Sequence, residues 1–207
     1  MDRVIKARLI RFELEQADIK LSETSVKDLE SIQLIKNIIL ALSNFSEFEL
    51  TIRPLYCNYK FLSEKHNQSK KYIAFFKYLR NKFVGHIKTE LINKSIEWRP
   101  EFGFLLKESD DKEIIFMFNI WILETAINSY VNKDGSHKIF QTETNLEYPE
   151  DSQRFTSLLR FCLNNIVDYL KQLESVLLEI IDLSEYESDN IIVWKKAAKT
   201  DFNFIKK

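Results

Sequence analysis

Apolar residues recur every three or four positions along most of the chain, the spacing that places them on one face of an α-helix. The longest such pattern covers roughly residues 150–183, and a second strong one covers 25–42. Ser25, with Asp28 three residues later, is the candidate N-cap of that second helix. Residues 3–18 carry a broad apolar stripe, with arginine and glutamate on the other faces. Together these patterns predict long helices that share one core.

The stretch that follows the second helix mixes apolar and polar runs. Residues 43–49 predict a looser end of that helix. Pro54 suits the start of a short helix over 55–62, because its missing N–H costs nothing in a first turn. The polar run 64–69 predicts a loop, and residues 70–84 predict the next helix. A glycine comes directly after this helix, where a helix end or kink is expected.

The second half of the chain predicts two more helices before the longest one. Residues 88–96 form a short helix that ends before Pro100, because a residue preceding proline avoids the helical region. Residues 112–131 are apolar nearly all round, which predicts a central helix. Residues 132–135 have the composition of a turn. Residues 137–146 fit either a short strand or an ordered loop.

Composition agrees with a helical chain. The 207 residues include three glycines, three prolines and sixteen phenylalanines, so helix breakers are rare and large apolar side chains are common. We expect an all-α fold, a compact helical bundle of about five to six helices. A single domain would span residues 1–207, with a C-terminal extension at 184–207 that either docks on the bundle or serves in a dimer.

Charge is distributed unevenly along the chain. The formal net charge is −1, which predicts no overall attraction to nucleic acid or to a membrane. Residues 60–88, however, contain eight lysines and arginines and one acid, a local charge of +7. Residues 143–189 contain eleven acids and three basic residues, a local charge of −8. The two segments either pack together and neutralise each other, or the basic one meets a polyanion.

Several classes of site find no support in the sequence. Cys57 and Cys162 form no C-x-x-C pattern and are expected to be buried, reduced thiols. His66 and His137 lack partners at ligand spacing, so we expect no metal and no cofactor. The longest apolar run, residues 114–122, is too short to span a bilayer, and the N-terminus does not read as a secretion signal. These features predict a cytoplasmic protein with no membrane partner.

Residues 78–87, which read YLRNKFVGHI, place an arginine, an asparagine and a histidine within seven positions at the end of an aromatic-rich helix. Arg80 and Asn81, followed by His86, match the R-N-x-x-x-x-H form of the R-x(4–6)-H signature of HEPN domains. The chain resembles a HEPN-type domain over these ten residues, and its helical pattern is compatible with such a core over roughly residues 25–183.

This resemblance implies both a fold and a function. HEPN domains are compact α-helical bundles, often dimeric, and many are metal-independent ribonucleases of toxin–antitoxin, abortive-infection and related defence systems. It implies an endoribonuclease that cleaves RNA by attack of the 2′-hydroxyl, acts as a homodimer and works with an antitoxin or another protein partner. Arg80, Asn81 and His86 would be its catalytic residues, and Lys77, Lys82 and Lys88 would bind RNA.

The chemistry of RNA cleavage explains why these residue types suit the task. The reaction takes a proton from the 2′-hydroxyl and gives one to the leaving 5′-oxygen. A histidine with an ordinary pKa of about 6.5 can do either near neutral pH. Negative charge grows on the phosphate oxygens, and the guanidinium of Arg80 can hold two of them at once. The amide of Asn81 can contact the phosphate or orient His86.

Helical geometry sets a condition on this site. In an unbroken α-helix six residues turn through about 600°, so Arg80 and His86 would point about 120° apart. One site therefore needs either a bend or helix end at Gly85, or a second chain whose residues complete a composite cleft. We tie catalysis to a homodimer for this reason. In the alternative, the three residues are solvated or capping groups, and the chain is a catalytically inactive helical module that binds RNA or a protein.

Overall fold

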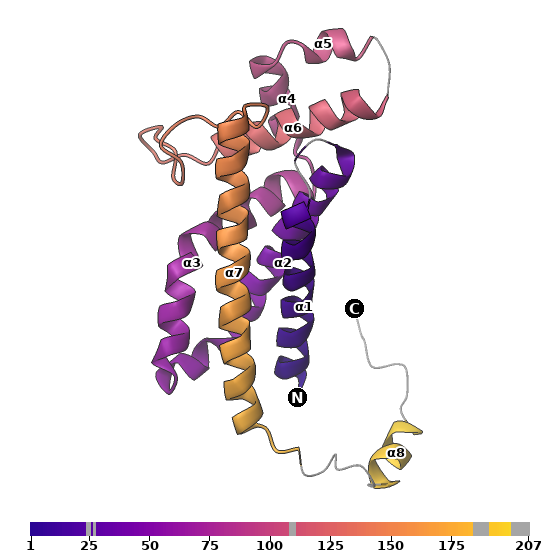
Figure 1. The fold of residues 1–207 in the computed structure, drawn as a ribbon, viewed down its shortest axis with the longest axis vertical. Helices are drawn as coiled ribbons and strands as arrows, with labels where there is room; N and C mark the ends of the chain where they lie inside the picture. The colour runs from indigo at the N-terminus through magenta and orange to yellow at the C-terminus, as the bar shows by residue number, and fades with distance from the viewer. Residues whose placement is uncertain (24–25, 27, 108–110, 184–190, 200–207) are drawn as a thin grey trace.

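The computed structural model describes residues 1–23, 26, 28–107, 111–183 and 191–199, so the predicted N-cap Ser25 and most of the predicted extension lie outside the described residues. Where the chain is described, it is helical and contains no β-strand (Figure 1). The prediction of an all-α fold is confirmed.

The helical elements follow one another with short connections. In chain order they are α1 (Asp2–Glu23), α2 (Leu29–Ile52), the 3-10 helix η1 (Arg53–Cys57), α3 (Lys60–Leu79), the π-helical turn η2 (Arg80–Val84), α4 (Thr89–Trp98), α5 (Phe102–Leu105), α6 (Lys112–Asn128), α7 (Pro149–Ile180) and α8 (Ile191–Ala197). Five of these have seventeen residues or more, and with α4 they correspond to the predicted bundle of five to six helices.

Four long helices run lengthwise beside one another, and a smaller group lies across one end of them (Figure 1). α1 packs against α7 and α2, while α3 packs against α2 and α7. α4, α5 and α6 form the end group, in which α6 packs against both α2 and α4. The π-helical turn η2 packs on α2, α3 and α6, so the candidate motif lies where the lengthwise helices meet the end group.

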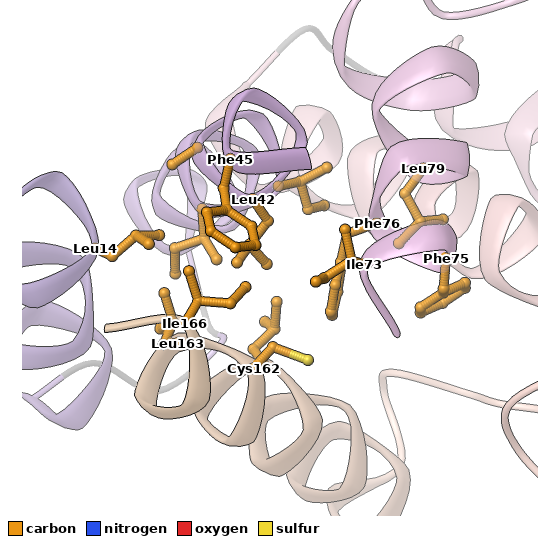
Figure 2. Close-up of a cluster of buried hydrophobic side chains, with 14 of the residues drawn as sticks. Leu14, Leu42, Phe45, Ile73, Phe75, Phe76, Leu79, Cys162, Leu163 and Ile166 are labelled. Atoms are coloured by element: carbon orange, nitrogen blue, oxygen red, sulfur yellow. The ribbon is translucent and has the colours of Figure 1, made fainter. Parts of the chain in front are cut away.

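The core is formed largely by the inward faces of α1, α2, α3 and α7, and it continues into α6 of the end group. Figure 2 shows side chains from these helices converging, among them Leu14, Phe45, Ile73 and Ile166. Cys162 is buried with them, as predicted, and burial raises the pKa of its thiol to about 12. The corresponding prediction for Cys57 is wrong. That cysteine is exposed, because it ends η1 at the turn into α3 and not on an inward helix face.

The predicted loop over residues 64–69 is wrong. α3 continues through this polar run, because the run contains no glycine or proline and its residues have adequate helix propensity. His66 and Ser69 are buried between Leu62 and Ile73, which gives an inward face with spacings of four, three and four. Glu64, Asn67 and Gln68 are exposed, whereas Lys65 is half-buried and pairs with Asp168. The polar residues His66 and Ser69 occupy the core side of the helix, and for this reason the sequence pattern predicted a loop.

The start of α2 is a capping box. Asp28 has an extended backbone conformation, and its Oδ1 accepts a hydrogen bond from the backbone N–H of Ser31 at 2.8 Å. The Ser31 hydroxyl oxygen accepts in turn from the backbone N–H of Asp28 at 3.2 Å. From this cap α2 runs unbroken to Ile52, so residues 43–49 are an integral part of the helix.

The connection between α6 and α7 is an ordered loop. Residues 132–135 form the predicted turn, in which Gly135 has a φ of 84°, a conformation that favours glycine. His137 then organises the segment that could have been a short strand. Its Nδ1 accepts from the backbone N–H groups of Ile139 and Phe140, and its Nε2 bonds the carbonyl of Ile127 at 2.8 Å. A single isolated bridge joins Val131 to His137. Of the two alternatives for residues 137–146, the ordered loop is the one observed.

None of the described helices combines the length and the apolar character needed to cross a membrane.

Candidate functional site

The candidate motif occupies a break in regular helical structure. α3 ends at Leu79, and the next five residues form a π-helical turn, in which the backbone N–H of Gly85 donates to the carbonyl of Arg80 at 2.8 Å. A hydrogen bond to the fifth preceding residue widens the turn relative to an α-helix; such turns are rare, and they occur frequently at functional sites. The buried ring of Phe83 anchors the turn in the core.

The helix ends where the sequence predicted. After Val84 the chain bends at Gly85 and stays non-helical until α4 begins at Thr89, with Lys88 extended. The 120° separation expected on a straight α-helix therefore does not apply. Arg80 opens the π-helical turn, and His86 lies just beyond its end.

Gly85 suits this position because of the space around it and not because of its backbone angles. Its φ of −70° is available to any residue. A Cβ at this position would lie 3.3 Å from the carbonyl oxygen of Arg80 and 4.0 Å from Arg80 Nε. The side chain of Arg80 thus passes close to the glycine backbone, and the glycine leaves room for it.

Arg80 is half-buried and carries no acidic partner among the described residues. Its Nη1 donates to Oδ1 of Asn81 at 3.0 Å. Its Nε is buried without a hydrogen-bond acceptor in the part of the chain that the structure describes. The amide of Asn81 therefore orients the arginine, one of whose polar groups remains unsatisfied. A guanidinium that is held in place and not neutralised is suited to an anionic ligand.

His86 stands apart from the other two residues. It is exposed, and it makes no hydrogen bond, ion pair or ring contact with any residue in the described ranges. The structure thus brings Arg80 and Asn81 into direct contact and leaves His86 as an open imidazole on the chain segment that leaves the same turn.

The three lysines expected to bind RNA surround this turn in sequence. Lys77 is half-buried in the last turn of α3, Lys82 is exposed within η2, and Lys88 is exposed immediately before α4. None of the three forms an ion pair with a described residue. They leave the turn surrounded by positive charge that the rest of the described chain does not balance.

Within the described residues, α7 pairs with only a small part of the basic segment. Between residues 60–88 and the described acids of α7 the structure has one ion pair, Lys65 with Asp168 at 3.5 Å. α7 turns its most buried acid, Glu174, toward α1 instead, where it accepts from Arg11 at 2.6 Å and from Arg8 at 3.2 Å. The sequence left open whether the basic and acidic segments neutralise each other. In the described residues, pairing with α7 neutralises one lysine of the basic segment, Lys65.

Lys36 is a cation beside the turn that sequence reasoning missed. Its Nζ lies 4.8 Å from the centre of the Phe83 ring and donates to Oδ1 of Asn119 at 2.7 Å. Burial lowers the pKa of this lysine. Lys36 belongs to α2, more than forty residues before the motif, so only the packing of η2 against α2 brings it there and no local pattern could have signalled it.

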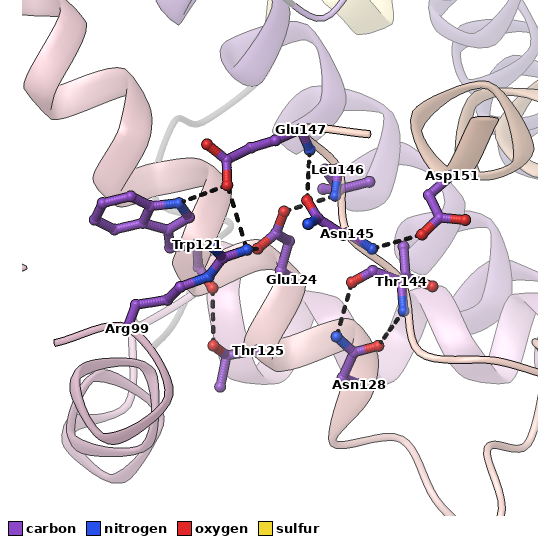
Figure 3. A network of polar contacts seen from close by, with 10 residues as sticks. All are labelled: Arg99, Trp121, Glu124, Thr125, Asn128, Thr144, Asn145, Leu146, Glu147 and Asp151. Atoms are coloured by element: carbon purple, nitrogen blue, oxygen red, sulfur yellow. Dashed lines mark hydrogen bonds and ion pairs between the residues drawn. The ribbon is translucent and has the colours of Figure 1, made fainter. Parts of the chain in front are cut away.

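A polar hollow of about 340 Å³ at the end group is a second candidate site. At its wall the buried carboxylate of Glu124 accepts from Arg99 at 3.1 Å and from the backbone N–H of Leu146 at 2.6 Å (Figure 3). Burial raises the pKa of Glu124, and Arg99 opposes that shift. Asn128 exchanges two hydrogen bonds of 2.8 Å with the backbone of Thr144. These contacts fasten the loop before α7 to α6, which is a structural role.

A third polar cluster lies inside the bundle around Glu49. The buried carboxylate accepts from Arg53 at 2.9 Å and from the Tyr56 hydroxyl at 2.9 Å. The Tyr56 and Tyr169 hydroxyls lie 3.0 Å apart, and Nδ1 of His66 lies 3.6 Å from Glu49. The groups satisfy one another, and no cluster of three metal-ligating side chains occurs in the described residues. Neither this cluster nor the hollow offers a free reactive group of the kind found at Arg80 and His86.

No protein-family model, curated protein or solved structure matches this chain. The resemblance to HEPN domains therefore rests on the ten residues of the motif and on their helical setting.

Proposed function

We propose that the chain is a HEPN-like, metal-independent endoribonuclease, with Arg80, Asn81 and His86 as its catalytic residues. One observation carries the proposal: an arginine without an acidic partner opens a π-helical turn, and an exposed histidine follows the end of that turn, amid basic side chains that form almost no ion pairs with the described acids. A phosphodiester backbone is the ligand whose charge and repeat suit such a surface.

Each catalytic residue has a distinct role in the proposed reaction. The 2′-oxygen of RNA attacks the adjacent phosphorus, the bond to the 5′-oxygen breaks, and a 2′,3′-cyclic phosphate and a 5′-hydroxyl result. His86 either takes the proton of the 2′-hydroxyl or supplies a proton to the 5′-oxygen, and water carries out the other proton transfer. Arg80 binds the phosphate oxygens as their charge rises, and Asn81 holds Arg80 in position for it.

RNA would be drawn to the site by Lys77, Lys82 and Lys88. None of the three forms an ion pair with a described residue, so they would act by attraction over distance and by direct phosphate contacts. Lys36, behind the Phe83 ring, adds a further positive charge to the same turn. Binding governed by such contacts weakens steeply as salt rises.

The proposed biological setting follows from the resemblance alone. The protein would be a toxin or defence component acting in the cytoplasm, with an antitoxin or other protein as its partner. The homodimer predicted from the sequence is part of the same proposal. Because the helix ends at η2 and His86 lies beyond it, the 120° separation expected on a straight helix does not by itself require a second chain.

The test is cleavage of a labelled single-stranded RNA by the purified chain in EDTA, with and without His86→Ala. We expect the substitution to reduce the rate by at least about a hundredfold, the lower range of general acid–base catalysis. Ile87→Ala, at the neighbouring exposed position, is the matched control and should leave the rate unchanged. Cleavage that survives His86→Ala, or that requires a metal ion, would overturn the assignment.

A second candidate function is RNA or protein binding without catalysis. The observation that favours it is the absence of any contact between His86 and the pair formed by Arg80 and Asn81. This alternative predicts RNA binding that weakens as salt rises and that is not accompanied by cleavage. Arg80→Ala should weaken the binding, and His86→Ala should leave it unchanged.

A further inference from the structure

Helix α1 is apolar on two opposite faces. Its inward face buries Val4, Ala7, Ile10 and Leu14 against the bundle. A second row, Ile5, Leu9, Phe12 and Ile19, points away from the core and is exposed. Leu9 and Phe12 are each 61% exposed, so packing within the described chain covers less than half of either side chain. We call this second row the outer seam.

The outer seam has the spacing of a coiled-coil contact face. Its members are separated by four and three residues, and with Gln16 the separations along α1 are four, three, four and three. This is the heptad pattern by which one helix packs against another over several turns. Single exposed apolar residues are ordinary on protein surfaces, but a row at heptad spacing along one helix is not.

A groove beside the seam provides a place for another helix to pack. It lies between α1 and α2, has a volume of about 450 Å³ and includes Phe12, Ala17, Leu34, Leu40 and Ala41 in its lining. Leu40, on the outer surface of α2, is itself exposed. A large side chain from an approaching helix would fill this groove, so the apolar surface extends from α1 onto α2.

The charges of α1 indicate which partner fits. Residues 2–12 contain four basic side chains and one acid, a net charge of +3, whereas residues 13–23 contain four acids and one lysine, a net charge of −3. Two copies of α1 packed antiparallel would set each basic half against an acidic half. Two parallel copies would set like charges together, which is unfavourable.

The seam also has the symmetry of a two-fold contact. Ile5 and Ile19 each lie seven residues from Phe12, on either side of it. An antiparallel pair with its two-fold axis at Phe12 places Ile5 of one copy beside Ile19 of the other, and the two Phe12 rings together. The two-fold rotation then sets the outer seam of one copy against that of the other, and each basic half against an acidic half.

We propose that the outer seam of α1 is a self-association surface, on which a second copy of the chain packs antiparallel about Phe12. The surface shares no residue with the segment 77–88, so it stands or falls independently of the proposed ribonuclease activity. A parallel pair, the chain's own C-terminal segment and a different protein are the competing occupants.

The first experiment measures the mass of the full chain in solution by light scattering after gel filtration, over a range of concentrations. We expect a dimer that Phe12→Asp weakens by at least about tenfold in dissociation constant, as for a central interface residue. Phe104→Asp is the matched control, because Phe104 is 72% exposed on α5 and should not affect association. A monomeric wild type, or a dimer that Phe12→Asp leaves intact, overturns the proposal.

The second experiment determines the orientation by disulfide crosslinking, in a Cys57→Ser background because Cys57 is exposed. In the antiparallel arrangement Phe12→Cys crosslinks with itself. Ile5→Cys crosslinks with Ile19→Cys when the two variants are mixed, and neither of these crosslinks with itself. Efficient crosslinking of Ile5→Cys with itself indicates a parallel pair and overturns the antiparallel arrangement.

Discussion

Arg80 and Asn81 are joined at the first residues of a π-helical turn, where Nη1 of the arginine donates to Oδ1 of the asparagine at 3.0 Å. This contact fixes a guanidinium that has no carboxylate partner in the described chain. It assigns Asn81 to the arginine, whereas the sequence left open whether the amide would serve the phosphate or the histidine.

Removing this contact should loosen Arg80 without removing its charge. We expect Asn81→Ala to lower kcat for RNA cleavage by roughly fivefold, equivalent to one hydrogen bond of about 1 kcal/mol. KM should change less, because the lysines that attract RNA remain. Steady-state kinetics on one labelled RNA measures both constants. Equal kinetics for Asn81→Ala and the wild type would show that the contact has no role in catalysis.

Substituting Gly85 tests the space beside Arg80. In Gly85→Ala the new Cβ meets the Arg80 carbonyl at 3.3 Å, so the turn must shift. We expect a loss of roughly 1 kcal/mol in unfolding free energy and a lower cleavage rate. Gly103→Ala, a helical position in α5 with nothing within 4 Å, is the control, and should be neutral or slightly stabilising. Thermal unfolding of both variants makes the comparison, and similar effects at the two sites would contradict it.

The unpaired lysines should determine the salt dependence of RNA binding. A triple variant with Lys77→Gln, Lys82→Gln and Lys88→Gln removes up to three phosphate contacts. The slope of log affinity against log salt should then fall by about 2, at about 0.7 per contact on a single strand. Lys133→Gln, in the exposed turn before α7, is the control. Fluorescence anisotropy at several salt concentrations gives the slopes, and an unchanged slope would place the RNA elsewhere.

The Glu49 cluster should make stability depend on pH. Burial lowers the pKa of His66; Glu49 opposes this shift, while Arg53 and Lys70 add to it. The folded-state pKa therefore lies below the unfolded value of about 6.5, and the unfolded chain binds the proton more readily. The contribution of His66 to stability is complete above about pH 6.5 and is lost as pH falls below it.

Urea unfolding at pH 7.5 and at pH 5.5 measures this effect. His66→Gln should reduce the difference in unfolding free energy between the two pH values. His86→Gln, which changes an exposed imidazole, should leave that difference as it is in the wild type. If His66→Gln has the same pH dependence as the wild type, another group is responsible.

Local sequence patterns predicted the helices well where one face is apolar and the ends carry clear signals. The end of the helix at Gly85, the turn at 132–135 and the existence of a helix from residue 112 are examples, although that helix, α6, ends at Asn128 and lies in the end group and not at the centre as predicted. The prediction failed at residues 64–69, where His66 and Ser69 occupy inward positions that apolar residues usually hold. Their burial depends on partners from α2 and α7, which no local pattern contains.

The sequence proposes the residues of the candidate site but does not contain their contacts. Spacing located Arg80, Asn81 and His86, but a π-helical turn depends on how Phe83 packs against neighbouring helices. The approach of Lys36 to Phe83 is tertiary, as is the pairing of Glu174 with Arg8 and Arg11. That pairing engages charges of α1 and α7 with each other, so which charges remain unpaired could not be read from composition.

The pairing of α7 with the arginines of α1 has a practical consequence for how the molecule behaves as a whole. Its sequence pI of about 6.4 would class it as an acidic protein, to be purified on an anion exchanger at neutral pH. With Glu174 engaged by α1, the described residues leave the lysines around η2 without ion pairs and so distribute charge unevenly. We expect such a molecule to be retained by immobilised heparin in spite of its pI, and to approach a polyanion in a preferred orientation.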